Sequence, residues 1–234
     1  MILTAHQPGY MPWIGLFHKI YLADTFCYFD VAQYQSKEFD NRNKIKTNSG
    51  VLWLTVPVES KNHLEKKLHE IKIIHNGWQR KHIKSIELAY KKSKFFEKYF
   101  YEIQKILLTK HEYICDLNIE LIDFFLGALD INVKTIRASD YSFEGKKSDL
   151  VLDMCKKISA DSYIFGSQGK NYALVDSFNK SGISVFFQNY IHPEYVQLHG
   201  SFEPFMSILD LIFNCGHESK YVMLDANIRK ISEL

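Results

Sequence analysis

Polar side chains follow two short apolar runs near the start of the chain. The run at residues 2–5 ends at His6 and Gln7, and the run at residues 25–29 ends at Asp30. A histidine can accept a proton near neutral pH, and an amide can donate a hydrogen bond to a developing oxyanion. We therefore predict His6 as a general base, Gln7 as an oxyanion stabiliser, and Asp30 as a group that orients His6 or binds hydroxyls. The alternative for His6 is a structural histidine that joins loops through hydrogen bonds.

A second candidate group lies in the segment FDNRNKIK, residues 39–46, where Arg42 and Asn43 are neighbours. A guanidinium flanked by amides can hold a phosphate or a carboxylate in a forked geometry. We predict Arg42 and Asn43 as substrate contacts, with Asn43 as another oxyanion stabiliser, and we add Gln33 from the stretch after Asp30. A surface or structural ion pair is the alternative role for Arg42.

The segment NGWQRKHIK, residues 76–84, marks the predicted start of a helix. Asn76 or Gly77 would cap this helix, and His82 would lie in its first turns. Because a helix N-terminus attracts anions, we predict His82 as a ligand contact. A hydrogen-bonded structural histidine is the alternative.

The segment GSQGKNY, residues 166–172, is a glycine-bounded loop between a predicted strand and a predicted helix. The backbone N–H groups of such a loop can cradle a phosphate. We predict Ser167, Gln168 and Tyr172 as substrate contacts. The GxxxxGK[ST] spacing of a P-loop is absent, and a tight turn that needs glycine for backbone reasons is the alternative.

Other kinds of catalytic site find no support in the sequence. No HxH, HExxH or Cys/His cluster occurs, so we predict no metal site. No GxSxG motif marks a serine nucleophile, and none of the four cysteines lies in an obviously cationic loop. The cysteines are widely spaced and lack a CxxC pattern, which is typical of reduced thiols in a cytosolic protein.

The overall composition, with 46% hydrophobic and 24% charged residues, is that of a soluble globular protein. A net charge of +2 argues against a dedicated nucleic-acid-binding protein. Residues 1–111 hold 18 Lys and Arg against 10 Asp and Glu, whereas residues 112–234 hold 11 against 17. The positive half suits a phosphorylated or carboxylated ligand, although solvated lysines on helices would give the same balance. We see no signal peptide and no long apolar stretch, and we expect a cytoplasmic protein without membrane insertion.

Short apolar runs alternate with helical patterns over most of the chain. The runs are almost wholly apolar, as in strands of a sheet that is covered on both faces. The predicted strands are residues 2–5, 25–29, 51–58, 71–75, 133–136, 162–165 and 183–187. The predicted helices are residues 12–22, 79–91, 95–108, 114–129, 149–158 and 172–180.

This order of elements predicts an α/β fold with a mainly parallel, Rossmann-like sheet flanked by helices and a helical block in the middle of the chain. We treat residues 1–234 as a single α/β domain and residues 79–129 as a helical insertion or lid within it. Ligands of such sheets bind beyond the carboxyl ends of the strands. The polar residues that follow the strands would therefore collect at one edge of the sheet and form the site.

Several segments together resemble the WbqC-like protein family. They are HQPGYMPWIGLFHKI, ADTFCYFDVAQYQ, FDNRNKIK, WLTVPV and SFEPFMSILDLIFNCG, which follow one another in order over nearly the whole chain. The resemblance implies a protein of bacterial gene clusters for surface polysaccharides, such as O-antigen of lipopolysaccharide or capsule. It also implies that the characteristic positions include His6, Gln7, Asp30, Gln33, Arg42 and Asn43.

A second likeness concerns the fold. The first strand, the proline-led helix and the second strand resemble the start of nucleotidylyltransferases and pantothenate synthetases, and FGSQGKNYALVDSFNKSGISVFF resembles a late region of the latter. Those enzymes carry HxGH at the helix start, whereas the matching residues 13–16 contain no histidine. The likeness therefore implies a Rossmann-like sheet without the residues that adenylate chemistry requires.

Three functions remain open on the sequence. The first is a transferase that moves an acyl or aminoacyl group onto an amino sugar or sugar nucleotide, with a phosphopantetheine thioester of CoA or of an acyl carrier protein as donor. The second is an ATP- and magnesium-dependent ligase or nucleotidyl transferase on a degenerate HxGH fold. The third is a non-catalytic module that binds a sugar nucleotide or a carrier protein. The expected partners are thus a sugar nucleotide or another phosphorylated small molecule and, for some of these functions, an acyl carrier protein.

Overall fold

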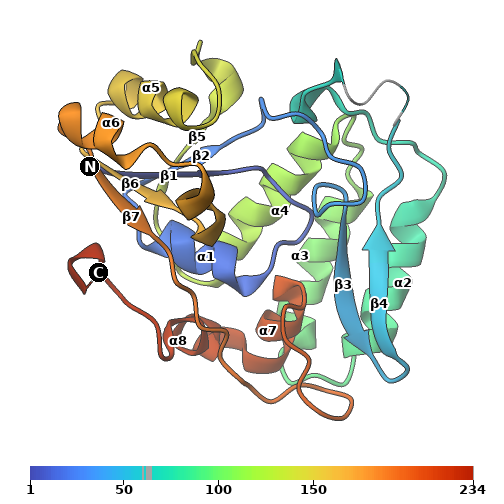
Figure 1. Ribbon diagram of the computed structural model, residues 1–234. Helices are drawn as coiled ribbons and strands as arrows, with labels where there is room; N and C mark the ends of the chain where they lie inside the picture. Colours follow the sequence, from blue (N-terminus) through green and yellow to red (C-terminus); the bar gives the residue numbers. More distant parts are fainter. Residues whose placement is uncertain (60, 62–64, 234) are drawn as a thin grey trace.

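A five-stranded parallel sheet forms the centre of the computed structural model, which describes residues 1–59, 61 and 65–233 (Figure 1). The strands lie in the order β5-β2-β1-β6-β7, and every neighbouring pair is parallel. Their bounds are β1 Ile2–His6, β2 Thr25–Tyr28, β5 Lys134–Arg137, β6 Ser162–Phe165 and β7 Ser184–Phe187. The predicted α/β fold with a mainly parallel sheet is confirmed.

The order of the strands reverses at β1. From β1 the chain proceeds outward through β2 to β5, and it then returns to the other side of β1 with β6 and β7. The connections that leave β1 and β6 run toward opposite faces of the sheet, which opens a crevice beyond the carboxyl ends of these two strands. His6 is the last residue of β1 and therefore lies at this crevice.

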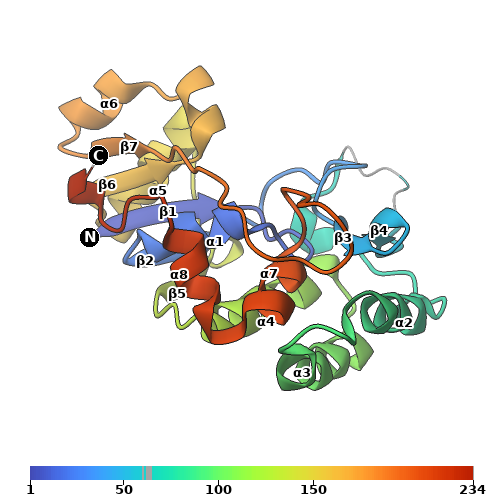
Figure 2. The ribbon, with the colours of Figure 1, turned by 90° about the horizontal axis from the view of Figure 1, so that it is seen from below.

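Helices cover both faces of the sheet (Figure 2). One face carries α1 Ile14–Tyr21 and α4 Ile114–Ala128, and the other carries α5 Ser148–Ile158 and α6 Val175–Lys180. Successive strand residues point to opposite faces, so Phe26 and Tyr28 pack in the core beneath α1 and α4, whereas Cys27 packs beneath α5 and α6. This burial on both sides explains why the inner strands, such as β2, read as apolar runs.

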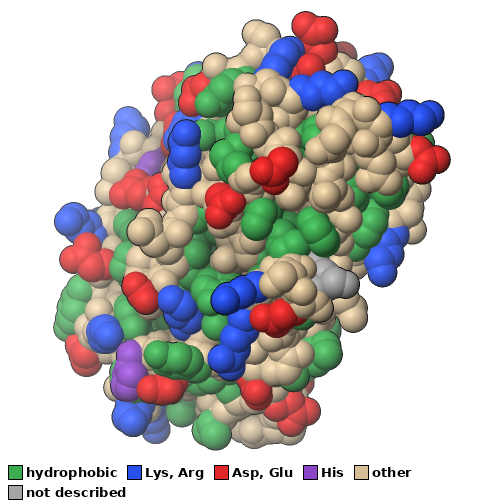
Figure 3. Space-filling model, turned by 90° about the vertical axis from the view of Figure 1, so that its left-hand side faces the viewer, with side chains coloured by type: hydrophobic (Ala, Val, Ile, Leu, Met, Phe, Trp, Pro, Cys, Tyr) green, Lys and Arg blue, Asp and Glu red, His purple; other side chains and the backbone are tan. Residues whose placement is uncertain are grey.

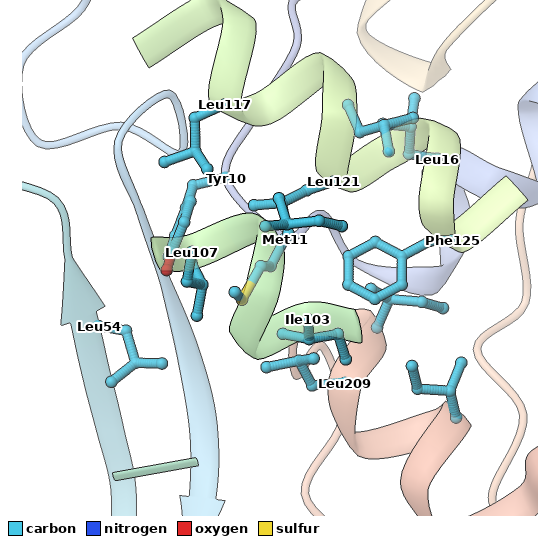
Figure 4. Close-up of a cluster of buried hydrophobic side chains, with 14 of the residues drawn as sticks. Tyr10, Met11, Leu16, Leu54, Ile103, Leu107, Leu117, Leu121, Phe125 and Leu209 are labelled. Atoms are coloured by element: carbon cyan, nitrogen blue, oxygen red, sulfur yellow. The ribbon is translucent and has the colours of Figure 1, made fainter. Parts of the chain in front are cut away.

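A β-hairpin and further helices stand beside the sheet (Figure 1). They are β3 Arg42–Thr47, β4 Gly50–Thr55, α2 Trp78–Tyr90, α3 Phe96–Leu108, α7 Ile208–Cys215 and α8 Ser219–Leu224, with the short 3-10 turns η2 Leu68–Glu70, η3 Ala138–Asp140, η4 Ser167–Asn171, η5 Gly216–Glu218 and η6 Ile231–Glu233. Their apolar side chains share one large core with α1 and α4. Figure 4 shows Met11 in this core among side chains of α3, α4 and α7. Movement of residues 79–129 as a lid stays a prediction.

Most predicted elements are confirmed, with ends that differ by up to three residues. The strand predicted at residues 71–75 is wrong: Lys72 and Ile73 form only isolated bridges, because each pairs with a different segment and no ladder continues. The strand β3 was not predicted, because its sequence RNKIKT is too polar to stand out as an apolar run.

Acidic and basic side chains are interspersed on the face that carries the chain termini, as on an ordinary solvated surface (Figure 3).

Within residues 1–59, 61 and 65–233, no helix has both the length and the apolar character needed to cross a membrane.

Candidate functional site

Two adjoining chambers lie at the crevice beyond β1 and β6. The aromatic chamber has a volume of about 340 Å³ and is lined by His6, Gly9, Pro12, Trp13, Leu16, Phe39, Asn43 and Phe205. The polar chamber has a volume of about 230 Å³ and is lined by His6, Trp13, Gly15, Leu16, Lys19, Gly166, Ser167, Gln168, Gly169 and Gln188. Because His6, Trp13 and Leu16 line both, the two chambers are neighbours that meet at these residues, and together they are called the cleft.

The tautomer of His6 follows from its hydrogen bond. Its Nδ1 atom lies 2.8 Å from the carbonyl oxygen of Gln7, and a carbonyl oxygen can only accept, so Nδ1–H is the donor. In the neutral ring, Nε2 then carries a lone pair. Within the described residues Nε2 has no hydrogen-bond partner, so it is available to a ligand in the cleft.

The surroundings keep the His6 ring neutral. By accessible surface His6 is an exposed residue, with its ring open to the cleft, while the protein atoms packed around it displace part of the surrounding water. This removal from bulk water, together with the nearby ammonium group of Lys19, lowers the pKa of His6 to about 4, although the hydrogen bond to Gln7 opposes the shift. At neutral pH His6 is therefore a neutral imidazole with a free Nε2 atom.

Lys19 is a buried lysine in the polar chamber. Its Nζ atom donates a hydrogen bond of 3.0 Å to the carbonyl oxygen of Ala5, and the residue is only 4% exposed. Burial lowers the pKa of Lys19 to about 7. Among the described residues no carboxylate forms an ion pair with it. The helix α1 positions Lys19, because the residues before and after it on this short helix are also buried.

The far wall of the polar chamber is the turn that follows β6. Gly166, Ser167 and Gln168 open the 3-10 turn η4, where the amide of Gly169 donates to the carbonyl oxygen of Gly166. A side chain at Gly169 would overlap Phe165, so only glycine lets the turn approach the end of β6 this closely. The structure therefore brings Ser167 and Gln168 to the cleft, beside His6.

Gln188, which lines the polar chamber, forms two hydrogen bonds with α1. The Nε2 group of Gln188 donates to the carbonyl oxygen of Gly15 at 2.8 Å and to Nδ1 of His18 at 2.9 Å. His18 Nε2 donates in turn to the carbonyl oxygen of Ile228. This chain of bonds holds α1 against the segment after β7 and keeps the wall of the chamber rigid.

Trp13 separates the two chambers. A Cβ atom at Gly15 would collide with the indole ring, so the glycine allows Trp13 to lie flat across the start of α1. The ring packs against Tyr190 and Phe205, with centroid distances of 5.5 Å and 5.6 Å. Phe205 comes from the long segment between β7 and α7 and is 50% exposed. The aromatic chamber thus has rings that can stack on a planar or apolar ligand.

The other side of the aromatic chamber comes from Phe39 and Asn43. The backbone amide of Tyr10 donates to the carbonyl oxygen of Phe39 at 3.0 Å, and this close approach favours glycine at position 9, where a Cβ atom would lie 3.1 Å from that oxygen. Asn43 donates to the carbonyl oxygen of Met11 at 2.8 Å through Nδ2. Its amide carries a second N–H, and Asn43 lines the aromatic chamber. The ligand role predicted for Asn43 stays a prediction.

Asp30 lies away from the lining of both chambers. Its two carboxylate oxygens accept from the amide and the hydroxyl of Ser139, at 2.9 Å and 2.6 Å, and its carbonyl oxygen accepts from His69. Asp30 is fully buried in this position. These contacts hold the end of β2 to the turn that follows β5.

Arg42 and His82 also have partners outside the cleft. The Arg42 guanidinium lies 4.5 Å above the Trp53 ring and donates to the carbonyl oxygen of Lys37. His82 is buried on α2, where it forms a 2.9 Å hydrogen bond with the hydroxyl of Tyr10. Burial lowers the pKa of His82 to about 4.

The remaining predicted residues lie near the cleft or across the sheet from it. Gln7 provides the carbonyl oxygen that His6 bonds, but its side chain lines neither chamber. Gln33 forms an isolated bridge with Lys67. Tyr172 lines a separate cavity of about 390 Å³ beneath α5, on the opposite face of the sheet from His6.

Sequence reasoning missed several residues of the cleft, namely Trp13, Lys19, Phe39, Gln188 and Phe205. The sequence could have indicated Lys19, because it is the only lysine in the mostly apolar helix sequence IGLFHKIY. A signal also existed for Gln188, which directly follows the apolar run of β7. The sequence around Phe205 gave no such indication, since Phe205 lies far along the chain from the strands that form the cleft.

The cysteines and possible metal ligands offer no competing centre in the described part of the chain. Burial raises the pKa of Cys27 and of Cys155 to about 12, so these thiols stay protonated and are poor nucleophiles. No group of three His, Cys, Asp or Glu residues within residues 1–59, 61 and 65–233 could hold a metal ion.

The fold is that of a doubly wound α/β protein with a cleft at the switch point of its sheet. The sequence model of the WbqC-like protein family matches residues 7–222, and the chain belongs to this family. The chain is also similar to a protein of Mycobacterium tuberculosis (strain ATCC 25618 / H37Rv) named "Uncharacterized protein Rv1507c". The two are 32% identical over 215 residues, which cover 91% of this chain and 93% of that protein. No solved structure matches the chain.

Proposed function

We propose that the protein is a transferase of bacterial surface-polysaccharide biosynthesis, which moves an acyl or aminoacyl group onto the amine of an amino sugar or sugar nucleotide. The observation that carries the proposal is the position of His6. His6 lines both the aromatic chamber and the polar chamber, and its Nε2 atom has no hydrogen-bond partner among the described residues. A ligand with an apolar or planar part and a phosphorylated part would fit across the two chambers.

The two chambers divide the ligand by chemistry. Trp13, Phe39 and Phe205 offer ring surfaces to a base, a sugar or an acyl arm. Lys19, Ser167 and Gln168 offer donors to a polar group. The reacting amine and the carbonyl carbon of the donor would meet between them, beside His6.

The transfer step needs a thioester donor, such as one carried by phosphopantetheine. The neutral amine attacks the thioester carbonyl, a C–N bond forms, and the nitrogen loses a proton to Nε2 of His6. The C–S bond then breaks, and His6 returns the proton to the departing thiolate, so amide and thiol are the products. The second N–H of Asn43 is the candidate donor to the oxyanion of the intermediate.

The test is a mass-spectrometric assay for amide formation, with a panel of acyl-CoA donors and amino-sugar nucleotide acceptors. We expect product with the wild-type protein and a loss of kcat of about 10²–10⁴-fold in His6→Gln, with ligand binding retained. His217→Gln is the matched control, because that histidine is exposed and remote from the cleft. Full activity of His6→Gln would contradict the role of His6.

A second candidate, nucleotidyl transfer or ligation with ATP and magnesium, is favoured by the strand order. The reversal at β1 is the arrangement in which doubly wound sheets bind nucleotides. Release of pyrophosphate or formation of ADP or AMP, dependent on ATP and magnesium, would favour this candidate. Ligand binding without turnover of any donor would instead favour a non-catalytic module that binds a sugar nucleotide or a carrier protein.

We also propose a cytoplasmic location for this activity. The four cysteines are all free, and three of them are buried. Free thiols of this kind are usual in the reducing cytosol. Fractionation of cells that express the protein would test the location.

A further inference from the structure

Burying the unpaired ammonium group of Lys19 costs free energy, and an anionic ligand would offset this cost. A lysine ammonium group has three N–H donors, and within the described residues Nζ of Lys19 has one acceptor, the carbonyl oxygen of Ala5. The residue is 4% exposed, so water does little to compensate. Buried charges in proteins are normally paired, because an unpaired one carries the full cost of its desolvation.

In the part of the chain that the structure describes, the groups that line the polar chamber with Lys19 include no negative charge. From β1 it faces His6, which is neutral at pH 7, and from η4 it faces Ser167 and Gln168. Gln188 faces it from the segment after β7. No aspartate or glutamate lines the polar chamber or the aromatic chamber in the described part of the chain.

We propose that the polar chamber is a phosphate-binding subsite in which Lys19 pairs with a phosphate or diphosphate oxygen of the ligand. Hydroxyl and amide groups of Ser167 and Gln168 lie in the same chamber and can donate to further oxygens of the anion. The chamber, at about 230 Å³, shares His6 in its lining with the aromatic chamber. A phosphate here would leave the rest of the ligand directed into the aromatic chamber.

This inference rests on the proposed function for its choice of a phosphorylated sugar derivative as the complete ligand. The subsite itself is measured without turnover. Phosphate binding at Lys19 with no transfer activity would overturn the transferase and leave the subsite standing. Transfer activity that Lys19→Met does not affect would overturn the subsite alone.

The experiment measures binding of inorganic pyrophosphate to the wild-type protein and to two variants by calorimetry at constant ionic strength. Lys19→Met keeps the length of the side chain and removes the charge. Lys170→Met is the matched control, because Lys170 lies in the same turn η4 but is exposed and lines neither chamber. We expect saturable binding to the wild type, a loss of at least about tenfold in affinity in Lys19→Met, and no change in Lys170→Met.

A labelling experiment keeps the inference testable if Lys19→Met fails to fold. Wild-type protein is treated with trace acetic anhydride, with and without pyrophosphate, and acetylation of each lysine is read by peptide mass spectrometry. Pyrophosphate should protect Lys19 at least fivefold more than Lys170. No binding of pyrophosphate at millimolar concentration, equal loss in both variants, or binding that leaves Lys19 unprotected would each overturn the subsite.

Discussion

The ammonium group of Lys19 donates a 3.0 Å hydrogen bond to the carbonyl oxygen of Ala5, the residue directly before His6. The bond joins the helix α1 to the end of β1 and places a buried cation beside the imidazole at the junction of the two chambers. The charge of Lys19 helps to hold the pKa of His6 low, after the effect of burial itself. The two residues therefore form the electrostatic centre of the cleft.

The first prediction concerns pH and Lys19. Burial lowers its pKa to about 7 from an ordinary value of 10.5 in the unfolded chain. Between these pH values the unfolded chain binds more protons, so the contribution of Lys19 to the free energy of unfolding rises with pH from about 7 to about 10.5 and is constant below. Lys19→Met should be more stable than the wild type at pH 7, on the order of a few kcal/mol.

That advantage should shrink as the pH rises toward 10. Urea unfolding at a series of pH values measures it. His6, the other titratable group in the polar chamber, has a pKa of about 4 and does not titrate in this range. A stability difference between the two proteins that stays constant from pH 7 to pH 10 would contradict the burial argument.

The second prediction concerns Phe205, whose ring lines the aromatic chamber. Phe205→Ala should lower the affinity for a nucleotide sugar by about tenfold or more, since stacking on one ring contributes about 1–3 kcal/mol. The stability should change little, because the side chain is 50% exposed. Leu88→Ala is the matched control, at 57% exposure on α2. Equal affinity in both variants would exclude Phe205 from the binding surface.

The third prediction compares two helical glycines. Gly15→Ala would drive a methyl group into the Trp13 ring and displace the indole that separates the chambers. We expect weaker ligand binding and lower stability. Gly127→Ala meets open space on α4 and should stabilise the protein by about 0.5–1 kcal/mol. Scanning calorimetry measures the melting temperature of both variants. An unchanged melting temperature in Gly15→Ala would contradict the tight packing of Trp13.

The fourth prediction separates Asp30 from catalysis. Asp30→Asn weakens the bonds to the amide and hydroxyl of Ser139 and should cost about 1–3 kcal/mol of stability. In the folded fraction, kcat should stay near the wild-type value. Ser139→Ala should reproduce part of the stability loss, and the double variant should cost less than the sum of the two. A fall in kcat without a loss of stability would instead support the catalytic role that the sequence predicted for Asp30.

The sequence predicted the sheet well because its inner strands β1, β2 and β6 are largely buried and read as apolar runs. The same pattern marked His6, Ser167 and Gln168, since residues at the ends of parallel strands meet at one edge. It did not reveal β3, whose polar residues obtain their partners only when the hairpin folds. The large core shared by α2, α3, α4 and α7 follows from tertiary packing, and sequence pattern alone gave no contacts for it.

The candidate site was less predictable than the fold, for identifiable reasons. Residue type suggested a catalytic role for Asp30 and a ligand role for Arg42. In the structure Asp30 bonds Ser139, which is distant in sequence, and Arg42 lies against Trp53 of the adjacent hairpin strand. Lys19 resembles a surface lysine until the burial of the whole helix is known. Phe205 reaches the cleft because residues 188–207 pass across it, and no local pattern indicates that path.

The most direct test of the central claim is the thermal unfolding midpoint of the protein against a panel of ligands. The panel contains UDP- and dTDP-amino sugars, acyl-CoA compounds, free phosphopantetheine and ATP with magnesium. A ligand that binds the folded state alone raises the midpoint by mass action. The two-chamber cleft predicts a rise with an amino-sugar nucleotide that both Phe205→Ala and Lys19→Met diminish. No rise with any member of the panel, or a rise that neither variant reduces, would contradict it.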